Sequence, residues 1–537
     1  MRNKSAPINR IPGEILSLVP RYLKHQPTDK DEDFIALTHV CHGWRQLFIS
    51  HPSLWTRLDF TNVDKTRTFI ERSKSMPLDI IVRDSDDGIY VEEAFVLAVP
   101  HVRRFRSLTI GQTSSSLRNF TTHIMHHMPL LEEVTMYFTC DPAPSLIGIY
   151  GGDLPWRTLK LTGVVTNLPW GNMRNLTTFE LRCPQRTVVT AAELLDFLKS
   201  APNLEDITLE HSISPSPKAS SSQLVYLYQL KKITIVADQG RAALIYHLFI
   251  PERASLTLEF GFSRNKSPFP SCVPRQARNL NNLSRITTVN LRFARAKKFV
   301  RLAGPSGELK MFGYWEHEVQ MNPSPDLDRR ILHSLSSCLP LGETRRLTIS
   351  EYDVPTPGEI DKSPVHGILL RMLHLRTLQL VHCNNLPFIL ALNPTSSSFF
   401  LCPYLEELII YSEGLDEFDV PELVRMAKER ASRGAKLWSV KIIGPGVLLL
   451  GREVSELREH VTHVEHMLVG DTPEWDSGPD DEGASGVLTP EQMRALVKAF
   501  DGLGGQRLTM ASGIILSRVP NLMDVCRVPF PRIYVGC

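Results

Sequence analysis

Residues 201–209 read Ala-Pro-Asn-Leu-Glu-Asp-Ile-Thr-Leu, and the pattern of this stretch recurs along the chain. Its repeated part is an apolar residue, two polar residues, an apolar residue, a polar residue and an apolar residue. Clear copies centre on Val134, Phe179, Ile207, Ile233, Val289, Leu378, Leu408 and Val440. Weaker copies centre on Leu78, Leu108, Leu159, Leu256, Leu347, Val464, Leu508 and Val525. The final alternation predicts a short strand with one buried face.

The spacing of the copies indicates a repeat. Successive centres from 78 to 256 are 20 to 30 residues apart, and those from 347 to 440 are 30 to 32 apart. Four copies begin with a proline turn, at Pro129, Pro202, Pro403 and Pro520, and proline is suited to ending a preceding helix. Apolar spacing predicts helices over 191–198, 365–373 and 421–431.

Strand and helix therefore alternate in step with the repeat. This order predicts an α/β class and a right-handed solenoid, with strands on the concave side and helices outside. A doubly wound α/β domain is the competing architecture, but it would not repeat a proline turn from residue 129 to 520. The chain resembles divergent leucine-rich repeats, whose period is similar. The Asn or Cys that this family places after the strand is mostly missing, although Cys383 fits.

The first sixty residues have a different pattern. Ile11 to Leu16 opens a predicted helix, with Pro12 in the first turn, where its missing N–H has no partner to lose. A second helical pattern covers 34–48, and Gly43 could divide it in two. Three short helices bury little surface alone. They need a partner protein, or they cap the domain that follows.

Four blocks in this region resemble the F-box, in the form common among large fungal families. They are IPGEIL (11–16), VPRYL (19–23), LTHVCHGWRQLF (37–48) and HPSLWTRLDF (51–60). The sequence departs from the family pattern at Ile11, where leucine is usual, and in the longer, more charged loop from Lys24 to Asp33.

The F-box resemblance implies a function. Such a unit binds the Skp-type linker protein of a cullin-RING (SCF-type) ubiquitin ligase. The residues at the family's contact and core positions are Ile11, Pro12, Ile15, Leu16, Val40, Cys41 and Trp44. Aliphatic anchors around one large aromatic suit a protein interface. For Cys41 and Trp44, packing inside the helical unit is an equally open interpretation.

These patterns divide the chain into four parts. We expect an all-helical F-box over 1–60, the leucine-rich-repeat-like solenoid over 61–470, an acidic insertion over 471–488, and further repeats with a cap over 489–537. The insertion is rich in Gly, Pro and acidic residues, which predicts disorder, and a passive loop is favoured over a binding motif. A polar loop is expected over 265–282.

Composition limits the partners. Of 537 residues, 42% are hydrophobic and 22% are charged, as in a globular protein. Sixty basic residues nearly balance 58 acidic ones, so neither nucleic acid nor a membrane is expected as a partner. No export signal or membrane span is found, and the nine cysteines lack CxxC spacing. Reduced thiols in cytoplasm or nucleus are therefore expected.

The sequence offers little sign of catalysis. No P-loop, GxSxG or HExxH motif occurs. His460, His463 and His466 could approach a metal on a helix, but 461–467 fits a strand better, and there they would point to opposite faces. His123 and His127 could share a helical face without a third ligand. No catalytic residue, cofactor or metal is expected.

Three hypotheses follow. The first is a substrate-recognition subunit of the ligase, which binds a protein target of unknown identity through the solenoid and raises its local concentration. The second is a non-ligase scaffold whose F-box-like unit only caps the repeats. The third is an enzyme whose site lies on the concave face.

Overall fold

The chain separates into two compact units, Met1–Leu468 and Val469–Cys537. The computed structural model describes residue 35 and residues 38–60, 62–82, 89–111, 128–137, 155–163, 173–183, 189–212, 224–236, 242–262, 279–294, 297–305, 307–315, 325–352, 364–393, 401–411, 419–444 and 451–467, all in the first unit. Several predictions lie outside these residues: the helix at 11–16, the loop 24–33, the insertion 471–488 and the C-terminal part 489–537.

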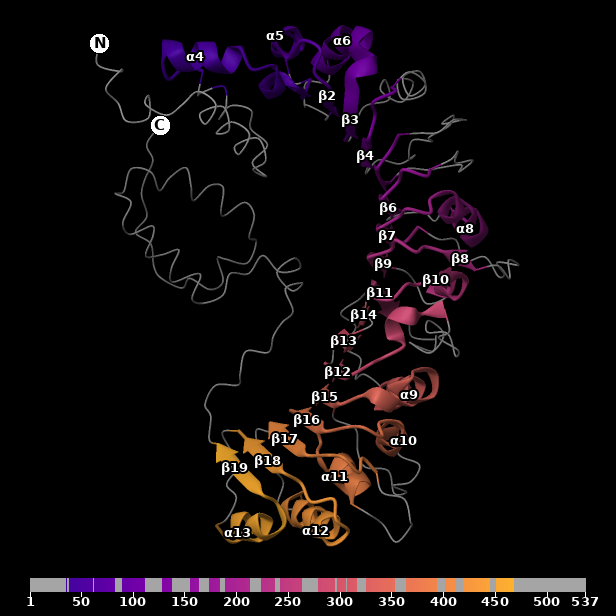
Figure 1. The fold of residues 1–537 in the computed structure, drawn as a ribbon, viewed down its shortest axis with the longest axis vertical. Helices are drawn as coiled ribbons and strands as arrows, with labels where there is room; N and C mark the ends of the chain where they lie inside the picture. The colour runs from indigo at the N-terminus through magenta and orange to yellow at the C-terminus, as the bar shows by residue number, and fades with distance from the viewer. Residues whose placement is uncertain are drawn as a thin grey trace, which may run out of the picture. The chain divides into compact units, whose positions relative to one another are not determined.

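The described part is a mixed α/β protein built on one large, mostly parallel sheet of 17 strands (Figure 1). Its strands are β1 (Arg57–Leu58), β2 (Leu78–Val82), β3 (Phe105–Ile110), β4 (Glu133–Tyr137), β5 (Thr158–Thr162), β6 (Thr178–Arg182), β7 (Asp206–Glu210), β9 (Lys232–Val236), β11 (Ser255–Phe262), β12 (Thr288–Arg292), β13 (Lys297–Gly304), β14 (Gly307–Trp315), β15 (Arg346–Ser350), β16 (Thr377–Val381), β17 (Glu407–Tyr411), β18 (Ser439–Ile443) and β19 (His463–Met467). Strands β8 (Val225–Tyr226) and β10 (Leu248–Phe249) form a small second sheet.

Nine α-helices occur in the described ranges. They are α4 (His42–Ile49), α5 (Val63–Ser73), α6 (Ile89–Ala98), α8 (Ala191–Ser200), α9 (Pro325–Cys338), α10 (Pro364–Arg371), α11 (Leu386–Leu392), α12 (Asp419–Ser432) and α13 (Gly451–His460). Short 3-10 helices are η3 (Pro52–Trp55), η4 (Val99–Arg104), η6 (Ala242–His247), η9 (Asn281–Leu283) and η10 (Leu341–Glu343). No helix in the described residues is long and apolar enough to cross a membrane.

The strands pair in the register of the sequence repeat. Ile207 lies opposite Phe179 on one side and Ile233 on the other, and Leu378 lies opposite Leu347 and Leu408. Every predicted repeat centre within the described residues lies in a strand. Leu508 and Val525 lie outside them. The mixed α/β class is therefore confirmed, together with the strand positions.

The sheet contains a hairpin that we did not predict. Strand β13 runs antiparallel to β12 and β14, while β14 pairs in parallel with β11, and β12 with β15. The hairpin β13–β14 thus separates β11 from β12. Its turn needs glycine, because a Cβ on Gly307 (φ +135°) would lie 2.8 Å from the carbonyl oxygen of Ala254.

The proline turns have a common geometry. The N–H of Leu131 donates to the carbonyl of Met128 (3.2 Å), and that of Leu405 donates to Cys402 (3.1 Å), so each turn closes across its proline. The fully buried guanidinium of Arg430 in α12 fixes the turn at Pro403. It donates to the carbonyl oxygens of Leu401 (3.1 Å) and Cys402 (2.8 Å). Burial lowers the pKa of Arg430 to about 10, so it stays charged at neutral pH.

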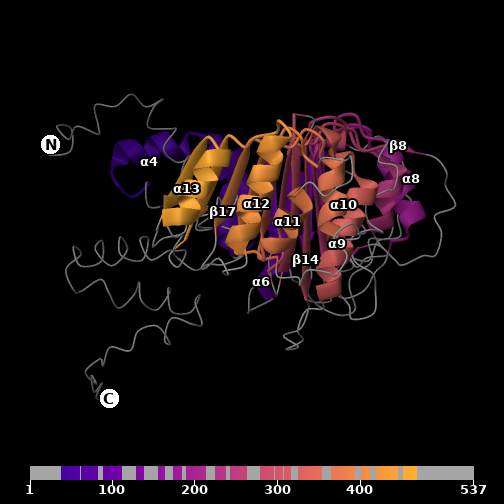
Figure 2. The same ribbon diagram turned by 90° about the horizontal axis from the view of Figure 1, so that it is seen from below.

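The predicted helices 191–198, 365–373 and 421–431 are confirmed as α8, α10 and α12. Helix α8 starts with a capping box, in which Thr190 and Glu193 satisfy each other's backbone N–H. Helices α9 to α13 lie on one side of the neighbouring strands (Figure 2). Residues 265–278 of the predicted loop lie outside the described residues. Its end differs from the prediction, because Leu280 forms a β-bridge with Ile250 and η9 begins at Asn281. The buried Asn279 donates to the carbonyl oxygens of Ile245 and Leu248.

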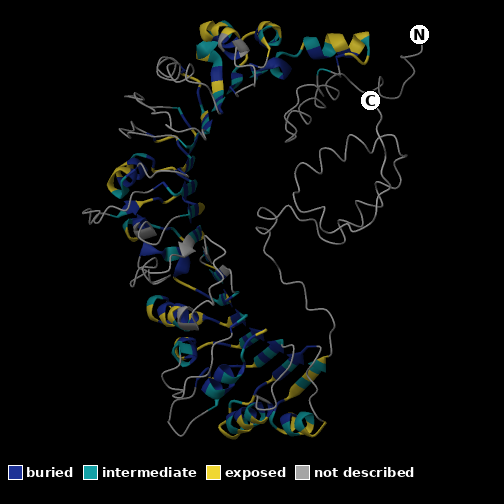
Figure 3. Cartoon of the chain, turned by 180° about the vertical axis from the view of Figure 1, so that it is seen from behind, coloured by how far each residue is buried: buried dark blue, intermediate teal, exposed yellow. Residues whose placement is uncertain are grey.

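Burial alternates along most strands, as the repeat predicts, although β15 and β18 have adjacent buried residues. The central residues Val134, Ile207, Leu378 and Leu408 are at most 1% exposed, whereas the residue after each is half-buried. In Figure 3 most strands carry buried and intermediate residues, whereas the helices and the last strand, β19, also carry exposed ones. The buried side chains of strands and helices form one hydrophobic core.

This alternation gives a stability prediction. Ile207→Ala is expected to lower the free energy of unfolding by about 2–5 kcal/mol, because it leaves a cavity in the hydrophobic core between two strands. Thr208→Ala, the matched control on the other face, should lower it by less than about 1 kcal/mol. Urea unfolding of both variants measures the contrast. Equal losses would show that the two faces are packed alike.

Candidate protein-binding surfaces

The F-box-like segment is described from its second helical block onward. Trp44 in α4 is 6% exposed, and its ring meets the edge of Phe48 at 5.6 Å between centroids. Cys41 is half-buried, whereas Val40 is 53% exposed. The ring of Trp44 thus packs inside the protein, which was the alternative to a contact with the linker. The side chain of Val40 is an apolar group on the surface. Ile11, Pro12, Ile15 and Leu16 lie outside the described residues.

The end of this segment is joined to the sheet. The indole Nε1 of Trp55 donates to the carbonyl of Phe48 (3.0 Å), and its ring meets Phe69 of α5 at 5.0 Å. The guanidinium of Arg72 lies 4.3 Å from the Trp55 ring centroid. Strand β1, still within residues 1–60, pairs with β2. The end of residues 1–60 is therefore joined to the first strands and helix of the sheet.

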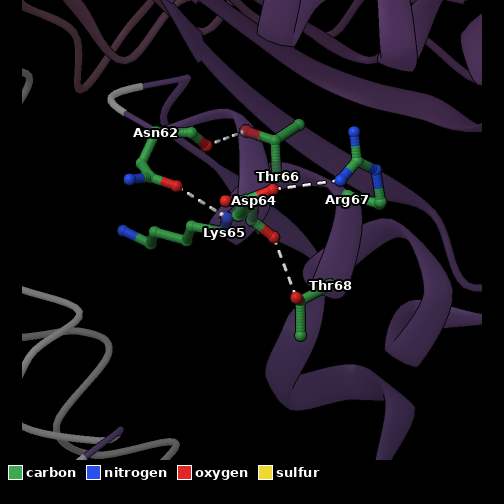
Figure 4. A network of polar contacts seen from close by, with 6 residues as sticks. All are labelled: Asn62, Asp64, Lys65, Thr66, Arg67 and Thr68. Atoms are coloured by element: carbon green, nitrogen blue, oxygen red, sulfur yellow. Dashed lines mark hydrogen bonds and ion pairs between the residues drawn. The ribbon is translucent and has the colours of Figure 1, made fainter.

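Helix α5, which follows at once, is fixed by local contacts (Figure 4). The side chain of Asn62 accepts the N–H of Lys65 (2.9 Å), and the hydroxyl of Thr66 donates to the Asn62 carbonyl (2.9 Å). Asp64 and Arg67 form an exposed ion pair at 3.0 Å. An exposed pair stabilises little, so the cap is the main determinant of where α5 begins.

A second surface is the side of the sheet opposite the helices, which we call the open face. It carries the side chains that alternate with the buried ones. Its central positions, in register, are Ile81, Thr109, Thr135, Lys160, Glu180, Thr208, Thr234, Thr257, Lys310, Arg301, Asn290, Thr348, Gln379, Ile409, Lys441 and Glu465. Threonine recurs here because a β-branched polar side chain suits a half-buried strand position.

Charges on the open face are paired with one another. Arg182 bonds Glu180 (2.5 Å) and Glu210 (3.1 Å). Lys441 lies between Glu407 (3.4 Å) and Glu465 (3.7 Å). On these strands, β6, β7 and β17 to β19, such pairing leaves no strip of one sign, so this part of the face is suited to a protein segment rather than to a phosphate backbone.

A buried polar cluster lies near one end of strands β12, β15 and β16. Lys298 is 1% exposed, and its Nζ is 2.9 Å from Asp328 Oδ1 and donates to the carbonyl of Phe293 (2.9 Å). Burial raises the pKa of Asp328, and the charge of Lys298 opposes that shift. Burial, with a smaller contribution from Asp328, raises the pKa of Tyr352. The cluster is enclosed, so it serves packing rather than substrate binding.

The cysteine that matched the repeat consensus has a structural role. Cys383 is buried, and its Sγ donates to the carbonyl oxygens of Val381 (3.1 Å) and Ile349 (3.2 Å), across two strands. Burial raises the pKa of Cys383 and of Cys183 to about 11, and that of Cys402 to about 12. These thiols therefore stay protonated at neutral pH.

The raised pKa values predict slow alkylation. At pH 7.5 in the native state, Cys183, Cys383 and Cys402 should react with iodoacetamide at least 100-fold more slowly than a thiol of ordinary pKa, because the thiolate fraction is smaller by that factor. The half-buried Cys41 and Cys338 should react first. Mass spectrometry of timed samples measures each rate, with the urea-unfolded chain as control. Labelling of Cys383 as fast as Cys41 would contradict the burial.

The described residues contain no ligand set for the metal sites that the histidines could have formed. His460 ends α13, while His463 and His466 lie in β19, which confirms the strand interpretation. The ring of His463 packs on Trp438 at 4.4 Å between centroids. The described ranges hold no group of three His, Cys, Asp or Glu side chains that could bind a metal. His123 and His127 lie outside them.

The main feature that sequence reasoning missed is on the hairpin. Phe299 and Phe312 face each other across β13 and β14, with centroids 4.9 Å apart, and both are half-buried on the open face. Alternating apolar and polar residues on each side of Gly304-Pro305-Ser306-Gly307 were a usable signal for this hairpin.

Comparison with known proteins gives no family assignment. A scan against protein-family models and a search of curated proteins each found no match to this chain.

Proposed function

We propose that this protein is the substrate-recognition subunit of a cullin-RING (SCF-type) ubiquitin ligase. In this proposal an all-helical F-box within residues 1–60 binds the Skp-type linker, and a leucine-rich-repeat-like solenoid binds the target protein. The protein itself has no catalytic reaction. It holds the target close to a charged conjugating enzyme, which raises the effective concentration of the reactants.

One observation carries the proposal: strands of a repeated register, with helices on one side and an open face on the other. Repeat proteins use such extended faces to bind other proteins. The open face has paired charges and threonines, as expected for a surface that contacts protein. The exposed Val40 (53%) also supports a contact near the F-box-like segment.

Affinity capture tests the proposal. The full chain and residues 61–537 are expressed with the same tag, and captured linker and cullin peptides are quantified. The full chain should retain both proteins, and the shorter chain should lose both. Because α4, η3 and β1 fall before residue 61, the shorter chain must first be shown to be folded, by a cooperative thermal unfolding transition. Equal capture of the linker by the two chains would reject the proposal.

A non-ligase scaffold is the second candidate, favoured by a specific contact. Trp44, Phe48 and Trp55 belong to the same hydrophobic core as the sheet. A segment that only capped the first strands would make these contacts. In that case the full chain would capture neither linker nor cullin, while its target would still bind.

A further inference from the structure

The open face changes character along the sheet. One row of positions, close to the carboxyl ends of the parallel strands, runs through strands β4 to β19. We call it the carboxyl-end row, and in register it is Tyr137, Thr162, Arg182, Glu210, Val236, Glu259, Phe312, Phe299, Arg292, Ser350, Val381, Tyr411, Ile443 and Met467. From β14 to β19 six of eight positions are apolar or aromatic, against two of six from β4 to β11.

The apolar part of the row has two groups. The first is the pair Phe299 and Phe312 on the hairpin. The second is Val381, Tyr411, Ile443 and Met467, on four adjacent strands. Val381 and Ile443 are buried, but they lie apart from the hydrophobic core on the helix side, and Met467 is 40% exposed. At ~4.8 Å per strand, Phe299 and Val381 are about 14 Å apart.

Basic side chains lie on the strands of the first group, β13 and β14, and on β12 and β15 between the two groups. Arg292 follows Phe299 in the row, and its side chain is 58% exposed although it pairs with Glu351 at 2.7 Å. Arg301 and Lys310 share one carboxylate, that of Glu308, at 2.5 and 3.8 Å. The open-face cations on β14, β13, β12 and β15 are Lys310, Arg301, Arg292 and Arg346. They outnumber Glu308 and the two bordering carboxylates, Glu259 and Glu351.

We propose that the target is bound along the carboxyl-end row from β14 to β19, through an acidic segment with two apolar anchors. One anchor packs on Phe299 and Phe312. The other packs on Tyr411 and Met467, which are the accessible members of the second group. A carboxylate between the anchors faces Arg292, and the cation surplus on β12 to β15, which does not extend to β17–β19, favours that charge over a basic one. Half-buried aromatic residues are suitable hot spots, because little conformational freedom is lost on binding. This inference rests on the proposed function and gives the chemical class of its target.

The test uses the full chain and a phage library of random 16-residue peptides at physiological salt. Selected peptides should carry two apolar clusters separated by Asp or Glu. For a synthetic peptide of this class, Phe299→Ala and Tyr411→Ala should each weaken binding at least 10-fold. Thr162→Ala and Thr208→Ala, on the polar part of the open face, are matched controls and should leave the affinity unchanged.

A charge exchange keeps the test independent of folding. Arg292→Glu alters an exposed side chain, and it should weaken binding of the acidic peptide at least 5-fold. A peptide in which Lys replaces the acidic residue should bind Arg292→Glu with the affinity that the acidic peptide has for the wild type. Basic or uncharged selected peptides, or peptides that bind Phe299→Ala and Arg292→Glu like the wild type, would overturn the inference. Linker capture by the same variants should not change. A failure of the peptide-binding inference can therefore be distinguished from a failure of the proposed function.

Discussion

Lys298→Met is expected to lower the free energy of unfolding by about 3–5 kcal/mol, the range for breaking one side of a buried ion pair. The substitution keeps the aliphatic stem but removes the ammonium, which lies 2.9 Å from Asp328 Oδ1. Asp328 is 8% exposed, so its carboxylate would remain in a poorly solvated place without that charge. The loss should appear as a lower urea midpoint with an unchanged slope.

The stability lost in Lys298→Met should depend on pH, in a direction set by the pKa of Asp328. Burial already raises the pKa of Asp328, and the pKa rises further when the opposing charge of Lys298 is removed. A carboxyl group with a folded-state pKa above its unfolded value favours folding when protonated, and this contribution is lost as pH rises through the folded pKa. The stability deficit of Lys298→Met should therefore shrink as pH falls from 7 toward the unfolded pKa of about 4.

A double variant controls for packing. Lys298→Met with Asp328→Leu replaces both charges by apolar groups, which is often neutral or stabilising for buried pairs. Most of the stability lost in the single variant should return. If the double variant is as unstable as Lys298→Met at every pH, loss of the hydrogen bond from Lys298 to the Phe293 carbonyl, rather than a stranded carboxylate, would explain the effect.

Ile15→Asp with Leu16→Asp is expected to abolish capture of the Skp-type linker by the full chain. In the proposed function, these two positions lie in the block that contacts the linker. Loss of an apolar anchor at an interface typically weakens binding by 2 kcal/mol or more, and an unpaired charge within the interface adds to this. Two such changes should reduce linker capture at least 100-fold, measured by co-purification at equal bait.

Val96→Asp is the matched control, since it adds a charge at an apolar position that is 67% exposed in α6. It should leave both linker capture and the melting temperature unchanged. The double variant should also keep the melting temperature of the sheet. Wild-type linker yield from a folded double variant would show that the IPGEIL block does not mediate docking.

The repeat was readable from sequence because its determinants are local. Leu204, Ile207 and Leu209 carry the strand pattern within six residues, and Thr190 with Glu193 marks the start of α8. Burial of Ile207 follows from the period-two alternation alone. Neighbouring copies then pair because each strand can bury its apolar face only beside the next.

The remaining features depend on contacts between distant residues. Lys298 and Asp328 approach only because β13 is inserted beside β12 and α9 lies over that region. Arg430 is buried because its guanidinium satisfies two carbonyl groups of a turn 28 and 29 residues earlier. A charged residue in a strand or a helix is normally expected on the surface, so neither case has a sequence signal. The hairpin had a local signal, but it does not follow the repeat.

Titration calorimetry with purified linker protein and the purified full chain tests the proposed docking most directly. The proposal predicts one linker bound per chain with a dissociation constant below about 1 μM, which corresponds to roughly 8 kcal/mol of binding free energy. The Ile15→Asp and Leu16→Asp double variant should give no heat of binding under the same conditions. Absence of binding by the folded wild-type chain would contradict the assignment as a ligase subunit.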